Sequence, residues 1–167
     1  MNLTLTQTEA DDLLALLKDR PELQDLASRI KALMPALAEA PATSGFRLGA
    51  TSLARLKGVH PDLVKVVKRA IELTKQDFTV LEGLRTKERQ KQLVAKGASK
   101  TMNSYHITGH AVDIAPIVNG QVSWDWKYYY PVRDAMKAAA KELGVKIEWG
   151  GDWKSFKDGP HWQIPRG

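Results

Sequence analysis

A histidine and an aspartate, His106 and Asp113, stand seven residues apart in the stretch SYHITGHAVD. Zinc and similar metals bind imidazole nitrogen and carboxylate oxygen at about 2.0 to 2.2 Å, so the two side chains can share one ion only if the backbone reverses between them. Seven residues span about 10 Å as a helix and about 23 Å as a strand. Gly109 adopts turn conformations at no steric cost, and we expect the reversal at Thr108 and Gly109.

Further ligands must come from elsewhere in the chain. The segment from Asp158 to His161 offers one more imidazole and one more carboxylate. Catalytic zinc is held by three protein ligands plus an open position, whereas structural zinc sites are usually closed and rich in cysteine. The chain has no cysteine, which excludes disulfides and thiolate–metal chemistry. A catalytic metal site is therefore the favoured interpretation.

The motif as a whole resembles a known enzyme family. The pattern is Ser104-x-His106-x-x-Gly109-x-Ala111-x-Asp113, followed by Asp158-x-x-His161. It resembles the zinc peptidases of the D-alanyl-D-alanine carboxypeptidase and dipeptidase superfamily, and more closely the L-alanyl-D-glutamate endopeptidases, many of which are phage endolysins. The likeness covers roughly Gly58 to Gln163.

The resemblance assigns the metal ligands. It implies that Zn²⁺ is held by His106, Asp113 and His161. His110 lies three residues before Asp113, on the other face of a strand, and is not expected to be a ligand. His60 precedes a proline that suits a first helical turn, so we expect it to support the start of a helix.

The resemblance also implies that Asp158 is the general base. It would accept a proton from the attacking water and return it to the leaving amine. Aspartate with an ordinary pKa of about 3.9 is a weak base at neutral pH, and burial beside a tryptophan would raise that pKa; the candidates are Trp149, Trp153 and Trp162. Glu148 and Asp152 are alternative candidates for the base.

Two further residues are expected to face the substrate. Arg85 in Gly83-Leu-Arg-Thr86 matches an arginine that faces the substrate in the superfamily. It would stabilise the developing oxyanion or bind a substrate carboxylate. Ser104 would form a hydrogen bond with the substrate or with a ligand.

The predicted function is that of a zinc-dependent endolysin that hydrolyses an amide bond of the peptidoglycan stem peptide, with L-alanyl-D-glutamate as the expected bond. The alternatives are a D-Ala-D-Ala carboxypeptidase or dipeptidase and a non-catalytic wall-binding module. A two-metal nuclease is disfavoured, because it needs more clustered carboxylates than this motif supplies. Ligands of this kind also accept manganese or cobalt.

Charge is distributed unevenly along the 167 residues. Residues 1–40 carry a net charge of −3 and the remainder +9. A basic surface attracts polyanions: nucleic acid, wall peptides rich in free carboxylates and anionic outer-membrane lipids would all serve. The resemblance implies peptidoglycan as the partner and no nucleic acid.

The N-terminal sequence lacks a basic stretch followed by an apolar core, so it does not indicate a secretory signal. No apolar run approaches the roughly 18 residues of a membrane span. We expect a monomer that does not insert stably into membranes. It would be synthesised in the host cytoplasm and act on the periplasmic cell wall after release.

The elements that position the motif predict an α+β fold, a small antiparallel sheet carrying the zinc site with helices packed on one side. Strands are expected over 77–82, 111–117, 121–124, 145–149 and 161–164, with helices from Pro61, over 87–95 and over 127–143. Leucine spacing in residues 1–40 predicts a helical hairpin, docked on its own domain or binding the wall or membrane. A turn-rich linker at 41–45 divides a helical extension, 1–42, from a peptidase domain, 46–167.

Overall fold

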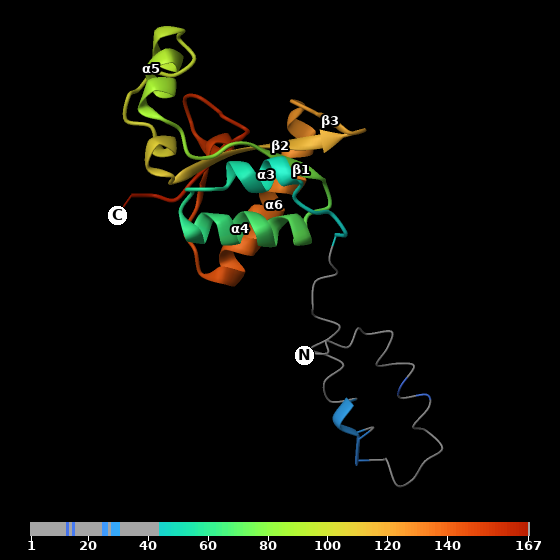
Figure 1. Ribbon diagram of the computed structural model, residues 1–167. Coiled ribbons are helices and arrows are strands. Elements are labelled where there is room, and N and C mark those ends of the chain that lie inside the picture. The colour runs from blue at the N-terminus through green and yellow to red at the C-terminus, as the bar shows by residue number, and fades with distance from the viewer. Residues whose placement is uncertain (1–12, 14, 16–24, 27, 31–43, 167) are drawn as a thin grey trace. The chain divides into compact units, whose positions relative to one another are not determined.

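The computed structural model describes residues 13, 15, 25–26, 28–30 and 44–166 (Figure 1). The chain divides into two units, Met1–Ala42 and Thr43–Gly167. The described residues of the first unit are helical, but most of the expected helical hairpin lies outside the described residues. The domain assignment 1–42 and 46–167 therefore stays a prediction.

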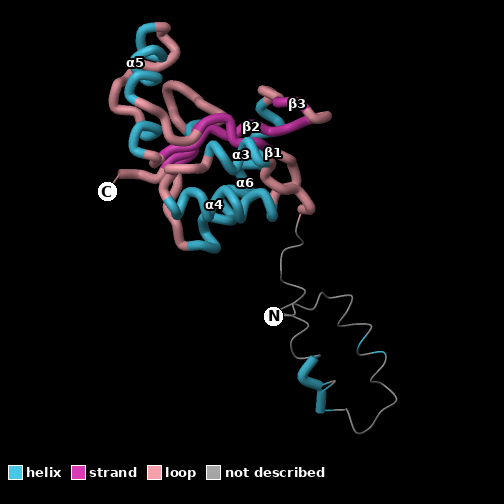
Figure 2. The backbone as a smooth tube through the Cα atoms, in the orientation of Figure 1, coloured by secondary structure: helices cyan, strands magenta, loops and turns pink. Residues whose placement is uncertain are grey.

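The second unit contains helices and short strands in alternation along the chain (Figure 2). Its α-helices are α3 (Ala50–Arg55), α4 (Pro61–Leu73), α5 (Lys87–Ala95) and α6 (Trp126–Leu143). Its strands are β1 (Phe78–Glu82), β2 (Ala111–Val118), β3 (Gln121–Val122), β4 (Glu148–Trp149) and β5 (His161–Gln163). Two 3₁₀ turns, η2 (Tyr105–Thr108) and η3 (Gly150–Asp152), lie next to the predicted metal ligands. Within the described residues, no helix combines the length and hydrophobicity that a bilayer crossing requires.

The strands form one antiparallel sheet in the order β1-β2-β5-β4, with β3 paired to β2. The β2–β3 hairpin turns at Asn119 and Gly120, whose φ angles of 51° and 78° are those of a primed turn. Strand β5 lies between β2 and β4 and all three of its residues are buried, so it does not show the expected alternation of exposure. The predicted α+β class with a small antiparallel sheet is confirmed.

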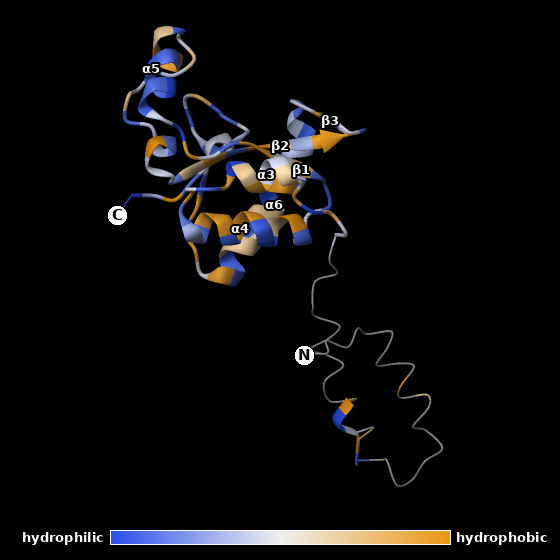
Figure 3. Cartoon of the chain, viewed as in Figure 1, coloured by the Kyte–Doolittle hydropathy of each residue, from blue (hydrophilic) through white to orange (hydrophobic). Residues whose placement is uncertain are grey.

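Helix α4 forms where the sequence predicts it. Pro61 occupies its first turn, and the Nδ1 atom of His60 accepts a hydrogen bond from the Asp62 N–H at 3.3 Å. The predicted support of the helix start by His60 is confirmed. The apolar residues of the expected inner face are all buried: Leu63, Val66, Val67, Ala70 and Ile71. Figure 3 shows hydrophobic and hydrophilic positions sharing this helix.

Helix α6 packs against α4 and closes the core over the sheet. It ends at Gly144, which has the left-handed φ of 66°. Leu143 is 41% exposed, although the helical period predicts it to face inward. The N–H of Val145 bonds back to the Ala140 carbonyl, and Val145 packs against the core in its place. Because Val145 takes part in this cap, strand β4 begins at Glu148 and not at residue 145, where the strand was expected to start.

Helix α3 was not predicted from the sequence, and it covers the edge strand β1. The Ser52 hydroxyl accepts a hydrogen bond from the Val80 N–H at 3.1 Å. The Arg55 Nη1 donates to the Val80 carbonyl at 2.8 Å. These bonds satisfy backbone groups that an edge strand otherwise leaves unpaired.

Candidate metal centre

His106 is presented by a tight turn. It lies in η2, where the Ser104 hydroxyl accepts a hydrogen bond from its N–H at 3.3 Å. The turn ends at Gly109 with φ 71°, and a Cβ atom there would collide with the Gly58 carbonyl. The chain then enters β2, which carries Asp113. The reversal expected at Thr108 and Gly109 is therefore present.

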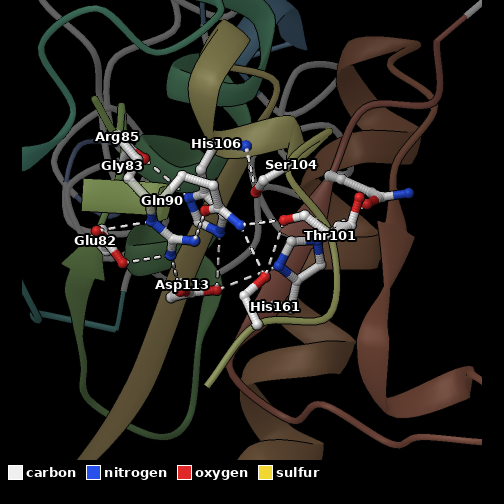
Figure 4. Close-up of polar contacts among 11 residues, drawn as sticks. Glu82, Gly83, Arg85, Gln90, Thr101, Ser104, His106, Asp113 and His161 are labelled. Atoms are coloured by element: carbon white, nitrogen blue, oxygen red, sulfur yellow. Dashed lines mark hydrogen bonds and ion pairs between the residues drawn. The ribbon is translucent and has the colours of Figure 1, made fainter. Parts of the chain in front are cut away.

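The structure brings the three predicted metal ligands together (Figure 4). Asp113 Oδ1 lies 3.3 Å from His106 Nε2 and 3.3 Å from His161 Nδ1. Donors bound at about 2.0 to 2.1 Å around a tetrahedral ion are separated by about 3.3 to 3.4 Å. The observed spacing is that of a metal site.

Hydrogen bonds behind the ligands orient both imidazoles. His106 Nδ1 lies 2.9 Å from the Gly83 carbonyl, and His161 Nε2 lies 2.9 Å from Gln163 Oε1. Each of these nitrogens donates to its partner when the ring is neutral, so the lone pairs of His106 Nε2 and His161 Nδ1 face Asp113. Gln163 in turn donates to Glu148 Oε2 at 2.7 Å. Two lone pairs and a carboxylate converge on a point that suits a cation.

Electrostatics within the cluster support this assignment. Burial opposes ionisation of Asp113, but hydrogen bonds and charge from His106 and His161 outweigh it and hold the pKa of Asp113 well below its usual range. Burial opposes the charging of His161, yet its hydrogen bond to Asp113 and the charge of that carboxylate leave the pKa of His161 raised. Positive charge is therefore favoured at the point where the three side chains meet. The donor set fits a divalent ion.

Arg85 lies beside the cluster and is held on two sides. Its Nε and Nη2 atoms donate to the two carboxylate oxygens of Glu82, and Nη1 donates to Gln90 Oε1 at 2.7 Å. Nη2 also lies 3.7 Å from Asp113 Oδ2, and the Arg85 N–H bonds the His106 carbonyl at 3.0 Å. Arg85 thus braces the segments that carry two of the ligands.

Asp158 enters the site from the loop before β5. Its N–H bonds the Gly150 carbonyl at 3.0 Å, and its own carbonyl accepts from the His161 N–H at 3.3 Å. A side chain at Gly150 would collide with Asp158. Burial raises the pKa of Asp158, and the charge of Asp113 adds to the rise. This is the direction that a general base requires.

The other two candidates for the base, Glu148 and Asp152, lie outside the cleft that opens onto the three candidate ligands. Glu148 accepts its hydrogen bond from Gln163 behind His161. Asp152 pairs with Lys137 at 2.7 Å on the surface. Of the three carboxylates, only Asp158 is among the described residues that line the cleft.

A cleft of about 640 Å³ opens onto the cluster. One wall comes from the segment that includes α5 and the loop after it, and the other from the loop between η3 and β5. Its lining includes Ser104, Arg85, Asp158, Trp153 and Phe156 together with the three candidate ligands. The Trp153 ring stands 5.1 Å from the His161 ring. The structure therefore gathers all the predicted site residues around one cleft.

His110 stays out of the cluster, as predicted. Its Nδ1 atom lies 2.9 Å from the Thr108 carbonyl, and its ring stands 5.1 Å from that of His60. The group of residues able to hold an ion includes neither of these histidines.

Sequence reasoning missed several residues that support the site. Glu82, Gln90 and Gln163 have no catalytic signature of their own, and their roles depend on contacts with Arg85 and His161. One signal was present for Gln163. It lies two residues after His161 on a strand, so the two side chains share a face.

Comparisons with known proteins agree with this geometry. The family model described as phage L-alanyl-D-glutamate peptidase matches residues 44–163. The chain is 41% identical over 126 residues to the L-alanyl-D-glutamate peptidase of Escherichia phage T5, covering 73% of this chain and 91% of that protein. It is 34% identical over 128 residues to the peptidoglycan L-alanyl-D-glutamate endopeptidase CwlK of Bacillus subtilis (strain 168), covering 64% of this chain and 75% of that protein. The solved structure of the L-Ala D-Glu endopeptidase ChiX of Serratia marcescens is similar, with a TM-score of 0.69, 46% identity and coverage of 72% and 92%.

Proposed function

This chain belongs to the phage L-alanyl-D-glutamate peptidase family, and we propose that it cleaves peptidoglycan stem peptides with a zinc ion held by His106, Asp113 and His161. It is a hydrolytic enzyme that acts on the amide bond between L-alanine and D-glutamate. The observation that carries the residue assignment is the convergence of the three donor atoms beside Asp158 in one cleft.

Zinc is the metal that suits this donor set best. Two neutral imidazoles and one carboxylate form a three-ligand site of the catalytic type. When bound there, zinc supplies a Lewis acid that polarises the amide carbonyl and makes water more acidic. Manganese or cobalt could occupy the same donors, so metal analysis of the purified protein tests the choice.

Asp158 moves the proton in the proposed reaction. Its carboxylate accepts a proton from the attacking water and returns it to the amine of the departing glutamate. The raised pKa of Asp158 improves its strength as a base. The backbone hydrogen bond between Asp158 and His161 supports this role, because it holds the two residues next to each other.

Arg85 and Ser104 complete the proposed machinery. Three N–H groups of Arg85 are used by Glu82 and Gln90, which leaves two of its five donors. We assign these to Asp113 and to the carbonyl oxygen on which negative charge develops. The Ser104 hydroxyl accepts from the His106 N–H, so its own O–H remains available to donate to the substrate.

The competing functions are less well supported. A D-Ala-D-Ala carboxypeptidase or a non-catalytic wall-binding module would account for the motif, but the relatives carry the L-alanyl-D-glutamate peptidase name. The cell wall is then the place of action. Arrival there from the host cytoplasm stays a prediction.

Mass spectrometry of digested peptidoglycan tests the proposed function. Purified protein should release fragments with N-terminal D-glutamate, and a chelator should abolish that release until zinc is restored. Release of free D-alanine without any new N-terminal D-glutamate would indicate a carboxypeptidase instead. Sedimentation with the wall and no new amino groups would indicate a binding module.

A further inference from the structure

Lys100 is a cation of the cleft that the proposed reaction does not use. It lies in the loop after α5 and lines the cleft together with Arg85 and the metal ligands. Among the described residues, Lys100 forms no ion pair, whereas Arg85 is neutralised by Glu82. Lys100 thus brings a positive charge to the cleft that no carboxylate of the described chain compensates.

Contacts on two sides limit the position of Lys100. Gln90 holds its loop, because Gln90 Nε2 donates to Ser99 Oγ at 2.7 Å and to the Thr101 carbonyl at 2.6 Å. The same Gln90 side chain accepts from Arg85, so the loop is tied to the centre of the site. On the other side, Lys100 Nζ stands 5.2 Å from the centroid of the Phe156 ring.

The lysine and the phenylalanine come from opposite walls of the cleft. Phe156 is 59% exposed and lies in the segment that also carries Asp158. A cation over an aromatic face is held loosely at an exposed site, so the ammonium keeps its hydrogen-bond donors for a ligand. Phe156 limits where that ammonium can go.

The other charges of the cleft favour an anionic ligand at the side of Lys100. Glu82, Asp113 and Asp158 are all acidic and line the same space. Glu82 and Asp113 have positive partners, but Asp158 repels a second carboxylate. An anionic group of the substrate is therefore best placed toward Lys100, at the side of the α5 loop.

The substrate of the proposed function carries such a group. Glutamate joined to alanine through its amine keeps two carboxyl groups. When one of them continues the stem peptide, the other remains a free carboxylate. We propose that Lys100 binds this free carboxylate and thereby selects glutamate on the leaving side of the scissile bond. The inference rests on the proposed function, and it names the residue that sets specificity.

Two synthetic peptides and three variants test the inference. The first peptide contains L-alanyl-D-glutamate with the free carboxylate, and the second has that group converted to a carboxamide. Lys100→Gln removes the charge, Lys100→Arg retains it, and Lys96→Gln removes an equal charge from the same loop outside the cleft lining. The readouts are kcat and KM for zinc-loaded protein at low and high salt.

With the carboxylate peptide, we expect Lys100→Gln to raise KM by roughly twofold to fivefold with kcat nearly unchanged, as for loss of one exposed ion pair. Lys100→Arg and Lys96→Gln should stay near wild type. With the carboxamide peptide, wild type and Lys100→Gln should have the same KM. Added salt should raise the wild-type KM for the carboxylate peptide more than it does for Lys100→Gln.

Equal effects of Lys100→Gln on both peptides, or no effect on either, would overturn the assignment to Lys100 while leaving the peptidase function intact. If the wild-type protein cleaves neither peptide and also leaves peptidoglycan uncut, the proposed function itself fails, and the inference fails with it.

Discussion

Asp113 and His161 are direct partners across the antiparallel pair of β2 and β5, with the carboxylate Oδ1 3.3 Å from the imidazole Nδ1. The distance between two of the proposed metal donors is therefore set by strand register. A slip of one residue would turn one of the two side chains to the other face of the sheet. The metal site is correct only when the sheet is correctly paired.

Loss of Asp158, the proposed general base, should slow turnover strongly without loss of the fold. We expect Asp158→Asn to lower kcat by roughly 10²- to 10⁴-fold, while zinc content and circular dichroism stay as in wild type. Asp152→Asn is the matched control, because Asp152 pairs with Lys137 on the surface. A wild-type rate for Asp158→Asn would assign the base elsewhere, with Glu148 next to be tested.

Metal removal should lower thermal stability as well as activity. A ligand that binds only the folded state adds about 2.7 kcal/mol at a free concentration of about one hundred times its Kd. Zinc should therefore raise the Tm of chelator-treated protein, with one ion per chain by elemental analysis. His106→Ala should not respond to zinc, and His110→Ala should respond like wild type. A zinc-dependent rise in Tm of His106→Ala would contradict the ligand assignment.

The hydrogen-bond chain behind His161 should tune metal affinity. Gln163→Leu removes the acceptor for His161 Nε2–H, and such changes typically weaken metal binding by about 10- to 100-fold. Glu148→Gln keeps an oxygen that can accept from Gln163, so its effect should be smaller. Competition with a fluorescent zinc chelator measures both. Equal Kd values for wild type and Gln163→Leu would show that these hydrogen bonds do not affect the affinity for the metal.

The Tm of the chelator-treated protein and the increase in Tm caused by zinc should change with pH in opposite directions. Burial opposes protonation of His161, but the bond to Asp113 raises its pKa above that of an unfolded histidine. A raised pKa stabilises the fold below the unfolded value of about 6.5, and this contribution is lost as the pH rises through the folded pKa.

The Tm of the chelator-treated protein should thus fall through this group as the pH rises above the unfolded value of about 6.5, and His161→Gln should remove that part of the slope. Zinc binding needs the neutral imidazole, so the increase in Tm caused by zinc should grow over the same range. Scanning fluorimetry at fixed ionic strength measures both trends. A zinc effect that shrinks with rising pH would be incompatible with His161 as a ligand.

Gly109 should tolerate no side chain. Its φ of 71° is left-handed, and a Cβ atom would collide with the Gly58 carbonyl. Gly144 has a similar φ of 66°, but a Cβ atom there would meet no other atom within 4 Å, so Gly144→Ala measures the backbone strain alone, about 1 kcal/mol. Gly109→Ala should lower the free energy of unfolding by about 1 to 3 kcal/mol more than Gly144→Ala does, because it adds the collision. Urea denaturation compares the two variants, and equal losses would contradict the close approach.

Local sequence patterns were sufficient for helices α4 and α5 and for the turn at the site. The helical period of α4 predicts its buried face, and the bounds of α5 agree with the structure. Both depend on interactions between residues close in sequence. The glycine at 109 likewise predicts the reversal that brings His106 toward Asp113.

Interactions between distant segments were not accessible from sequence. Ser52 of α3 bonds the backbone of Val80, 28 residues later, and nothing in the short segment 50–55 indicates that partner. The contacts of Arg85 with Glu82 and Gln90 depend on how α5 leaves β1. The pairing of β5 between β2 and β4 depends on the whole sheet. The motif identified the site residues, but the contacts that support them could be recognised only in the folded structure.

The central place of β5 affects how the enzyme is made. Strands β2 and β4 both precede β5 in the chain, yet β5 is the strand that lies between them. A nascent polypeptide that has left the ribosome only as far as β4 contains His106 and Asp113 but not His161. Its strands β2 and β4 also lack the strand that pairs with both. With His161 as one of the proposed metal ligands, we expect hydrolytic activity to require that translation has passed His161.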